Sequence, residues 1–290
     1  MKGILLAGGN GTRLYPSTNA ICKQLIPVFD KPMIYYPLST LMLIGIKDIL
    51  IISTPSDTPI LQKVLGDGSS LGIHLEYKMQ EKPKGIPDAF ILGKEFIGTD
   101  NVCLMLGDNI FYGQGLYSSL GKATQLKEGA VIFGYYVKNP ERYGVLEFTS
   151  NGEVVGIAEK PQTPKSNYAI PGIYFFDYTV IEKTLNIIPS KRGELEITDV
   201  IKKYLIENRL KVELIGRGVA WLDTGTPESL LDASDFIATL EKRQGLKVAC
   251  IEEVAYRKGF ISKSQLKKLI CDLPECSYRE YLTNLFLPIK

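Results

Sequence analysis

Short apolar runs alternate with segments of helical periodicity through the first half of the chain. The apolar runs lie at residues 4–7, 49–53 and 102–106, and each has the length of one buried strand. Apolar side chains recur at helical spacing over residues 34–42, and a second helix is expected over 87–94. Strands that alternate with helices in this way form a mostly parallel sheet with helices on both faces. Ligands gather at the carboxyl ends of such strands.

The pattern changes to successive strands after residue 130. A helix is expected at 197–207, a longer one at 227–243, and two or three short helices beyond 245. The sequence therefore predicts an α/β fold: a Rossmann-like, mostly parallel central sheet with an inserted β-rich region and a small C-terminal helical appendage. The strands of the second half are expected at 131–137, 144–148, 153–158, 169–176 and 211–215, with a hairpin turn at 150–153.

Three glycines directly follow the first expected strand. Gly8, Gly9 and Gly11 let the backbone pass close to a ligand, and a helix beginning behind them would direct free N–H groups at phosphate. The dinucleotide fingerprint needs a glycine where Leu14 stands, and the Walker loop needs Gly-Lys-Ser/Thr where this chain has Thr-Arg-Leu. Arg13 supplies a fork-shaped cation suited to a polyphosphate. We interpret the segment as a nucleotide-binding turn; an ordinary glycine turn with a solvated arginine is the alternative.

Composition and charge exclude several classes of partner. The 290 residues carry a formal net charge of +2 without a long block of Lys and Arg, so neither nucleic acid nor an anionic membrane is an expected partner. No apolar stretch has the length of a signal peptide or a transmembrane helix. Five cysteines without a Cys-x-x-Cys pair indicate reduced thiols and a cytoplasmic protein. The lone His74 excludes a histidine-based metal cluster and is expected at the surface or in a strand.

Two aspartates stand where strands give way to turns. Asp108 follows a buried apolar strand, and Asp223 occupies a similar position far along the chain. Magnesium prefers one or two carboxylates together with phosphate oxygens and water, so this pair suits it beside a nucleotide-binding turn. Either aspartate alone is more often a helix cap or a turn former.

A second group of polar residues could hold phosphate, sugar or base. Lys160 follows a strand and could meet a second phosphate, with Glu159 beside it as acceptor for sugar hydroxyls. An exposed ion pair between these two is an equally good interpretation. Lys23, Gln24 and Gln80 add a cation and two amides, which are groups able to hold phosphate and to read a base edge.

Taken together, these segments resemble the glucose-1-phosphate thymidylyltransferase family of sugar nucleotidylyltransferases. The likeness covers nearly the whole chain, tail included, with matching order and spacing. The segments that carry it lie at residues 6–14, 23–25, 30–36, 106–109, 159–161, 192–199 and 221–226.

The resemblance implies a reaction and a set of site residues. dTTP and α-D-glucose 1-phosphate would give dTDP-glucose and pyrophosphate, the first step toward dTDP-L-rhamnose and related deoxysugars. Asp108 and Asp223 would bind Mg²⁺ and, with Arg13 and Lys160, would form the catalytic group. The nucleotide would be held by Gly8, Gly9, Gly11, Thr12, Arg13, Lys23, Gln24, Gln80, Gly85 and Asp108. The sugar phosphate would be held by Asn109, Tyr143, Gly144, Glu159, Lys160, Ile170 and Tyr174.

The resemblance also implies an organisation and an assembly. The fold would be of the nucleotide-diphospho-sugar transferase type, with a nucleotidyltransferase domain at residues 1–243 and an assembly or regulatory region at 244–290. Within the domain, residues 1–130 would mainly bind nucleotide and 131–226 mainly sugar phosphate. Relatives form homotetramers with a second nucleotide site for feedback. Arg217, Glu253 and Arg257 are placed where such a site could form, although a solvated charge cluster is as good an interpretation.

Five positions depart from the pattern of the family and make the substrate preference less secure than the reaction type. The family usually has Ser or Thr at Asn10, an acidic residue at Ala158, Thr at Pro171, and Ala-Gln at Pro87-Asp88. The alternatives are a uridylyltransferase, a thymidylyltransferase for another sugar 1-phosphate, and a nucleotide-sensing regulatory protein without turnover. A nicotinamide-dependent oxidoreductase is weaker, because the glycine fingerprint is broken.

Overall fold

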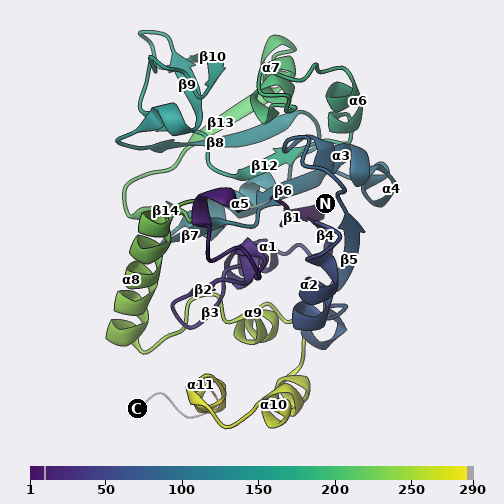
Figure 1. Cartoon of the computed structure of the whole chain (residues 1–290), viewed down its shortest axis with the longest axis vertical. Coiled ribbons are helices and arrows are strands. Elements are labelled where there is room, and N and C mark those ends of the chain that lie inside the picture. The colour runs from purple at the N-terminus through teal and green to yellow at the C-terminus, as the bar shows by residue number, and fades with distance from the viewer. Residues whose placement is uncertain (10, 286–290) are drawn as a thin grey trace.

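The computed structural model describes residues 1–9 and 11–285, so the departure at position 10 lies outside the described residues. A ten-stranded sheet runs through the centre of this part of the chain (Figure 1). Its strands lie in the order β10-β9-β11-β8-β12-β6-β1-β4-β5, and β13 pairs with β8. The mixed α/β architecture with a large, mostly parallel central sheet confirms the fold class that the sequence predicts.

The amino-terminal half of the sheet is parallel. Its members are β6 (Val102–Leu106), β1 (Lys2–Leu6), β4 (Asp48–Ser53) and β5 (His74–Met79), each hydrogen-bonded in parallel to the next. In the centre, Leu5 lies between Ile51 and Met105. Strands β1, β4 and β6 are apolar on both faces because helices cover both sides of a parallel sheet, whereas the edge strand β5 exposes His74 and Glu76.

Antiparallel pairing dominates the other half, where the sequence predicts inserted β-structure. The strands are β8 (Ala130–Tyr136), β9 (Gly144–Phe148), β10 (Val154–Glu159), β11 (Tyr168–Ala169), β12 (Ile173–Phe176) and β13 (Leu210–Leu214). The single strand expected at 169–176 is wrong: it is divided into β11 and β12. Pro171 stands in the break, and proline has no N–H to donate to a neighbouring strand.

Two apolar clusters lie on opposite faces of the sheet. One face is covered by α1 (Tyr35–Leu43), α2 (Thr58–Leu65), α5 (Leu116–Ala123) and α9 (Ile251–Arg257). The other is covered by α3 (Asp88–Leu92), α6 (Val180–Leu185) and α7 (Ile197–Ile206). The single helix expected at 87–94 is therefore wrong, since α3 ends before Gly93 and a separate α4 (Lys94–Ile97) follows.

The helix expected directly behind the glycine turn is also wrong. The structure has one 3-10 turn there, η1 (Thr12–Leu14), which ends at Tyr15. A second 3-10 turn, η2 (Lys23–Leu25), follows. Short antiparallel strands β2 (Pro27–Val28) and β3 (Lys31–Pro32) complete this segment. Any phosphate must therefore meet the loop itself and not the end of an α-helix.

The long helix α8 (Pro227–Gln244) begins and ends at the signals that the sequence contains. Thr226 and Ser229 form a capping box, Pro227 occupies the first turn, and Gly245 takes a left-handed conformation at the end. In Figure 1 the helices α10 (Lys263–Asp272) and α11 (Ser277–Asn284) lie at the end of the molecule opposite β9 and β10. No helix in the described residues is both long and apolar enough to cross a membrane.

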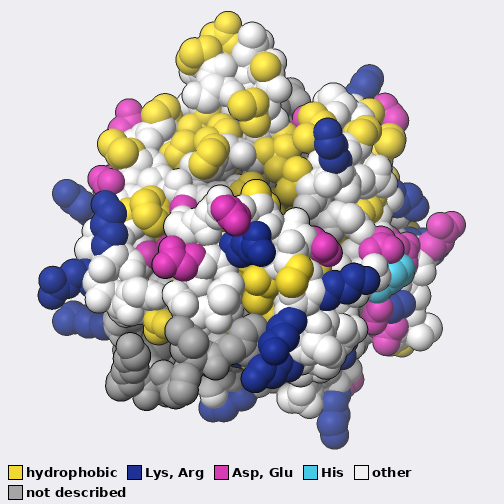
Figure 2. Space-filling model, turned by 90° about the horizontal axis from the view of Figure 1, so that it is seen from below, with side chains coloured by type: hydrophobic (Ala, Val, Ile, Leu, Met, Phe, Trp, Pro, Cys, Tyr) yellow, Lys and Arg dark blue, Asp and Glu magenta, His cyan; other side chains and the backbone are white. Residues whose placement is uncertain are grey.

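Figure 2 shows how charged side chains are distributed over one face of the molecule. Lys and Arg side chains are scattered over this face among acidic ones and do not merge into one basic block. This arrangement agrees with the small net charge of +2. It gives no sign, on this face, of the positive field that attracts nucleic acid.

Candidate active site

The glycine turn lies at the carboxyl end of β1 and is built for close approach. A Cβ atom added to Gly11 would lie 2.6 Å from Cγ2 of Thr18, and one added to Gly8 would lie 3.1 Å from Oε1 of Gln80. Gly9 has a φ of +107° and open space where a side chain would stand. The turn is therefore held by its neighbours on one side and leaves its backbone open on the other.

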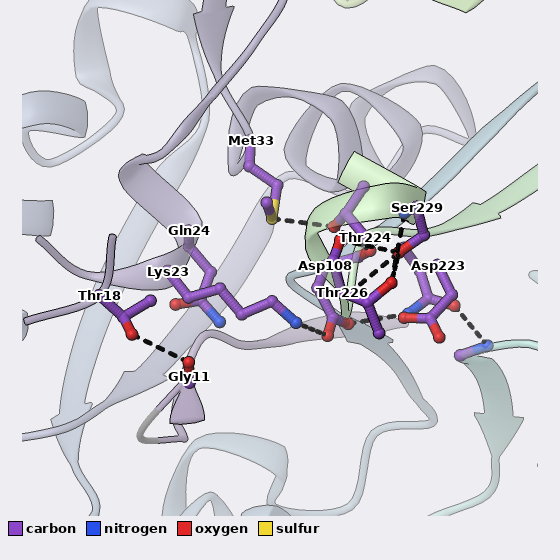
Figure 3. A network of polar contacts seen from close by, with 12 residues as sticks. Gly11, Thr18, Lys23, Gln24, Met33, Asp108, Asp223, Thr224, Thr226 and Ser229 are labelled. Atoms are coloured by element: carbon purple, nitrogen blue, oxygen red, sulfur yellow. Dashed lines mark hydrogen bonds and ion pairs between the residues drawn. The ribbon is translucent and has the colours of Figure 1, made fainter. Parts of the chain in front are cut away.

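Asp108, at the carboxyl end of β6, is paired with a buried lysine. Lys23 is 9% exposed and donates from Nζ to Oδ2 of Asp108, as Figure 3 shows. Asn109 donates from Nδ2 to Oδ1 at 2.8 Å. Burial raises the pKa of Asp108, but the charge of Lys23 and these two hydrogen bonds outweigh it, so the pKa lies below its ordinary value. Asp108 is consequently a carboxylate at neutral pH.

A two-stranded ribbon brings Asp223 beside Asp108. Strand β7 (Asn109–Gly113) pairs antiparallel with β14 (Val219–Asp223), and the register places Asp223 opposite Asn109. The hydroxyl of Thr224 fixes the junction by donating to the carbonyl oxygen of Asp108 at 2.8 Å. Burial and the negative charge of Asp108 raise the pKa of Asp223. Two carboxylates that repel each other in this way are suited to share a cation.

Both carboxylates line a large cavity in the described part of the chain. Its volume is about 480 Å³, which suits a sugar phosphate in size. Every residue that the sequence predicts for the sugar phosphate lines it, together with Arg13, Asp108 and Asp223. The predicted sugar-phosphate residues are Asn109, Tyr143, Gly144, Glu159, Lys160, Ile170 and Tyr174.

Acceptors and cations are interleaved along the cavity wall. Glu159 accepts from the hydroxyl of Thr198 at 3.1 Å and from Nη2 of Arg192 at 3.2 Å. Burial, followed by the charge of Glu196, raises the pKa of Glu159. Lys160 is 3.9 Å from Glu159, so the ion pair considered from the sequence exists, but its side chain is 45% exposed. Lys160 also has a φ of 41°, a strained conformation that accumulates at functional sites.

Comparison with known proteins identifies the family of the chain. The sequence model of the nucleotidyl transferase family matches residues 2–239 of the chain. A glucose-1-phosphate thymidylyltransferase of Mycobacterium tuberculosis is 55% identical over 98% of this chain and 99% of its own length. One of Neisseria meningitidis is 53% identical with the same coverage. The chain belongs to this family of nucleotidyltransferases.

A solved structure extends the likeness to three dimensions. A Bacillus anthracis protein described as a glucose-1-phosphate thymidylyltransferase, crystallised with sucrose, superimposes with a TM-score of 0.75 at 39% identity. The alignment covers 81% of this chain and 94% of that one. Membership of the thymidylyltransferase family therefore rests on sequence and on fold alike.

Of the residues predicted to hold the nucleotide, only Arg13 and Asp108 line the large cavity. Gly9 and Lys23 line a second cavity of about 320 Å³. Gln80 is buried and donates from Nε2 to Oδ2 of Asp88 at 2.8 Å, while Gln24 accepts from the thiol of Cys22 at 3.1 Å. The departure from the family at Asp88 thus has a structural partner in the amide of Gln80.

Gly85 is required by its backbone. Its φ is +103°, and an added Cβ would lie 2.1 Å from the carbonyl oxygen of Leu195. The amide of Leu195 donates to the carbonyl oxygen of Lys84 at 2.7 Å. The turn that the family motif assigns to the base is therefore fastened to the segment before α7.

The sequence interpretation missed nine of the residues that line the cavity: Ile86, Leu106, Arg142, Gly172, Arg192, Glu194, Ile197, Thr198 and Trp221. Trp221 donates from Nε1 to Oδ1 of Asn109 at 2.6 Å and so holds the amide that donates to Asp108. Arg192, Thr198 and Trp221 stand inside motifs that carry the resemblance, which was a usable signal. Arg142 precedes Tyr143 outside those motifs, and no pattern in the sequence marked it.

The structure does not bring together the three residues expected at a regulatory site. Arg217 lines a cavity of about 200 Å³ beside α5, and neither of the other two residues lines it. Glu253 accepts from Nε of Arg257 at 2.6 Å within α9 and also from the hydroxyl of Tyr281. In the described part of this single chain, the cavity beside Arg217 and the Glu253–Arg257 pair are therefore separate features and do not form one site.

Proposed function

We propose that the protein transfers a thymidylyl group from dTTP to α-D-glucose 1-phosphate, giving dTDP-glucose and pyrophosphate, the first step toward dTDP-L-rhamnose or another deoxysugar. The observation that carries the proposal is the meeting of Asp108, Asp223 and Arg13 in the wall of one sugar-sized cavity. Relatives at 53% and 55% identity bear the name of this activity. We assign the nucleotide to the glycine turn, Lys23, Gln24, Gln80 and Gly85, and the sugar phosphate to the cavity.

The chemistry needs positioning and charge neutralisation more than proton transfer. The second pKa of a phosphate monoester is about 6, so the attacking oxygen is already ionised at neutral pH. This agrees with a cavity in which no histidine lies among the lining residues. Arg13 and Lys160 offset the repulsion between the two anions as they approach.

The step is an in-line displacement without a covalent enzyme intermediate. An oxygen of the sugar phosphate attacks the α-phosphorus of the nucleotide, and the bond to the oxygen that bridges the α- and β-phosphates breaks. Pyrophosphate then leaves with that bonding pair. A chiral α-phosphorothioate of dTTP should therefore react with inversion at phosphorus, and retention would exclude the mechanism.

We propose Mg²⁺ as the metal, held by Asp108 and Asp223. The two carboxylates leave the remaining ligands to phosphate oxygens and water, which is the donor set that Mg²⁺ prefers. When bound, the ion supplies positive charge at the reacting phosphates. No group of three or more His, Cys, Asp or Glu side chains is placed to hold a metal anywhere in residues 1–9 and 11–285. The substrate phosphates thus complete the site.

We further propose a cytoplasmic homotetramer with a regulatory nucleotide site at a subunit contact. All five cysteines are free thiols, as in a reducing compartment. The helices α9 to α11 provide the surface for assembly, and Arg217, Glu253 and Arg257 would meet only across a subunit boundary. Sedimentation as a monomer would remove this proposal.

The experiment that tests the function is pyrophosphate release with Mg²⁺ and glucose 1-phosphate, with dTTP and UTP offered in parallel and each component omitted in turn. Release that depends on sugar phosphate and metal, and is faster with dTTP, is the expected result. Faster release with UTP would make the protein a uridylyltransferase. No release from folded protein with either nucleotide would favour another sugar phosphate or a regulatory role.

A further inference from the structure

We propose that Arg142 is an exchangeable counter-ion: it pairs with Asp223 while no divalent cation is bound, and it moves to the phosphate of the sugar substrate when a cation takes that carboxylate. Arg142 ends the 3-10 turn η4 (Pro140–Arg142) and lines the large cavity. The proposal rests on the function proposed above and adds a positioning role that the motifs do not assign.

The pairing of Arg142 with Asp223 is loose. Nη2 of Arg142 lies 3.5 Å from Oδ2 of Asp223, and the hydroxyl of Tyr143 approaches the same oxygen at 3.4 Å. Strong charge-assisted hydrogen bonds are several tenths of an ångström shorter. The Arg142 side chain is 40% exposed, and exposed ion pairs contribute little. A divalent cation can therefore displace Arg142 from this oxygen.

In the part of the chain that the structure describes, Asp223 lacks a close ion pair of the kind that Lys23 forms with Asp108. Lys23 pairs with Asp108, whereas Asp223 is only 15% exposed and stands close to the charge of Asp108. Arg13 lies on its other side, since both Oδ1 of Asp223 and Nη2 of Arg13 come within 3.1 Å of a Cβ added to Gly225. In the described residues Arg142 is the cation paired with Oδ2 of Asp223, so a divalent cation that binds this carboxylate competes with Arg142.

Once displaced, Arg142 stays within the substrate cavity. Its guanidinium carbon lies 5.5 Å from the centre of the Tyr143 ring, which offers a platform on which the group can rotate. Of the two other arginines that line the cavity, Arg13 lies beside Asp223, and Arg192 is held by two hydrogen bonds to Glu196 at 3.3 and 2.7 Å. Arg142 is therefore the arginine set free to form the bidentate contact that suits a phosphate.

The test begins with Mn²⁺ binding to substrate-free protein, followed by electron paramagnetic resonance. Arg142→Met removes the charge and keeps the bulk, so Mn²⁺ should bind at least threefold more tightly than to the wild type. Arg142→Lys keeps the charge and should bind Mn²⁺ as the wild type does. Arg192→Met is the matched control, because it removes a cation from the same cavity whose partners are Glu159 and Glu196, and Mn²⁺ affinity should change by less than twofold.

The second measurement follows the sugar phosphate. Arg142→Met should raise KM for glucose 1-phosphate at least tenfold and KM for dTTP by less than threefold. Unchanged or weaker Mn²⁺ binding in Arg142→Met would overturn the pairing with Asp223, and an unchanged KM for glucose 1-phosphate would overturn the exchange. Arg142→Gln replaces the methionine variant if the latter does not fold.

Failure of the proposed function remains distinguishable from failure of this inference. Wild-type protein that releases no pyrophosphate contradicts the transferase, but the Mn²⁺ titration needs no substrate and still decides the pairing. Calorimetric binding of glucose 1-phosphate in the presence of Mn²⁺ then replaces KM, with the same tenfold weakening expected in Arg142→Met.

Discussion

Replacing either candidate metal ligand, Asp108 or Asp223, by a neutral residue should lower activity to a similar extent. The two replacements should change the stability of the fold in opposite directions. Burial and the charge of Asp108 raise the pKa of Asp223, so its ionised carboxylate destabilises the folded protein at neutral pH. The charge and hydrogen bond of Lys23 lower the pKa of Asp108, so its carboxylate stabilises the fold. Asp223→Asn and Asp108→Asn therefore form a matched pair. Both should lose activity, but Asp223→Asn should stabilise the fold and Asp108→Asn should destabilise it.

The magnitudes follow from these surroundings. Each substitution removes a charge contact of the reacting phosphates and should lower kcat/KM by about 10²–10³, or about 3–4 kcal/mol. Asp223→Asn should stabilise the fold by about 0.5–2 kcal/mol, the gain that a single stabilising substitution commonly gives. Asp108→Asn leaves Lys23, which is 9% exposed, without its charged partner and should destabilise by about 1.5–3 kcal/mol.

Urea denaturation at pH 7, together with the pyrophosphate assay, measures both effects. The stabilisation in Asp223→Asn should shrink as pH falls through the raised pKa of wild-type Asp223, and it should be lost below the ordinary value of 3.8, because the wild-type carboxyl is then protonated in both states. Two variants that shift stability in the same direction, or an Asp223→Asn variant that keeps near-wild-type turnover, would refute the reasoning.

Three further predictions concern other parts of the molecule. Asp88→Leu removes the acceptor of the buried Gln80 amide and should destabilise the protein by about 1–3 kcal/mol in urea denaturation, whereas Asp88→Asn should lose less; equal losses would contradict the hydrogen bond. Gly85→Ala drives a Cβ against the Leu195 carbonyl and should fail to bind dTTP in calorimetry, while an intact affinity would show that the loop can move. Iodoacetamide on native protein, followed by mass spectrometry, should modify the exposed Cys271 and Cys276 within minutes. It should spare the three buried thiols, whose burial raises their pKa: Cys22, Cys103 and Cys250. Early labelling of any of these three buried cysteines would contradict their placement.

Local sequence was sufficient for features that depend on neighbouring residues. The capping box and the terminal glycine mark the two ends of α8. The apolar runs predict the parallel strands β1, β4 and β6 and the glycine turn that follows β1. Every residue that the motifs predict for the sugar phosphate also lines the large cavity, although other lining residues were not predicted. Short-range rules of capping, periodicity and glycine conformation do not require knowledge of distant contacts.

Tertiary structure alone decided how the site is assembled. The antiparallel register of β7 with β14 sets Asp223 beside Asp108, although 115 residues separate them and the sequence did not predict β7. The same packing brings Arg142 to Asp223 and Asp88 to Gln80. Contacts of this kind arise when separate elements bury their apolar faces against one sheet, so no local pattern encodes them. Residue types and their order thus predicted the chemistry, whereas sheet pairing determined which charges neutralise one another.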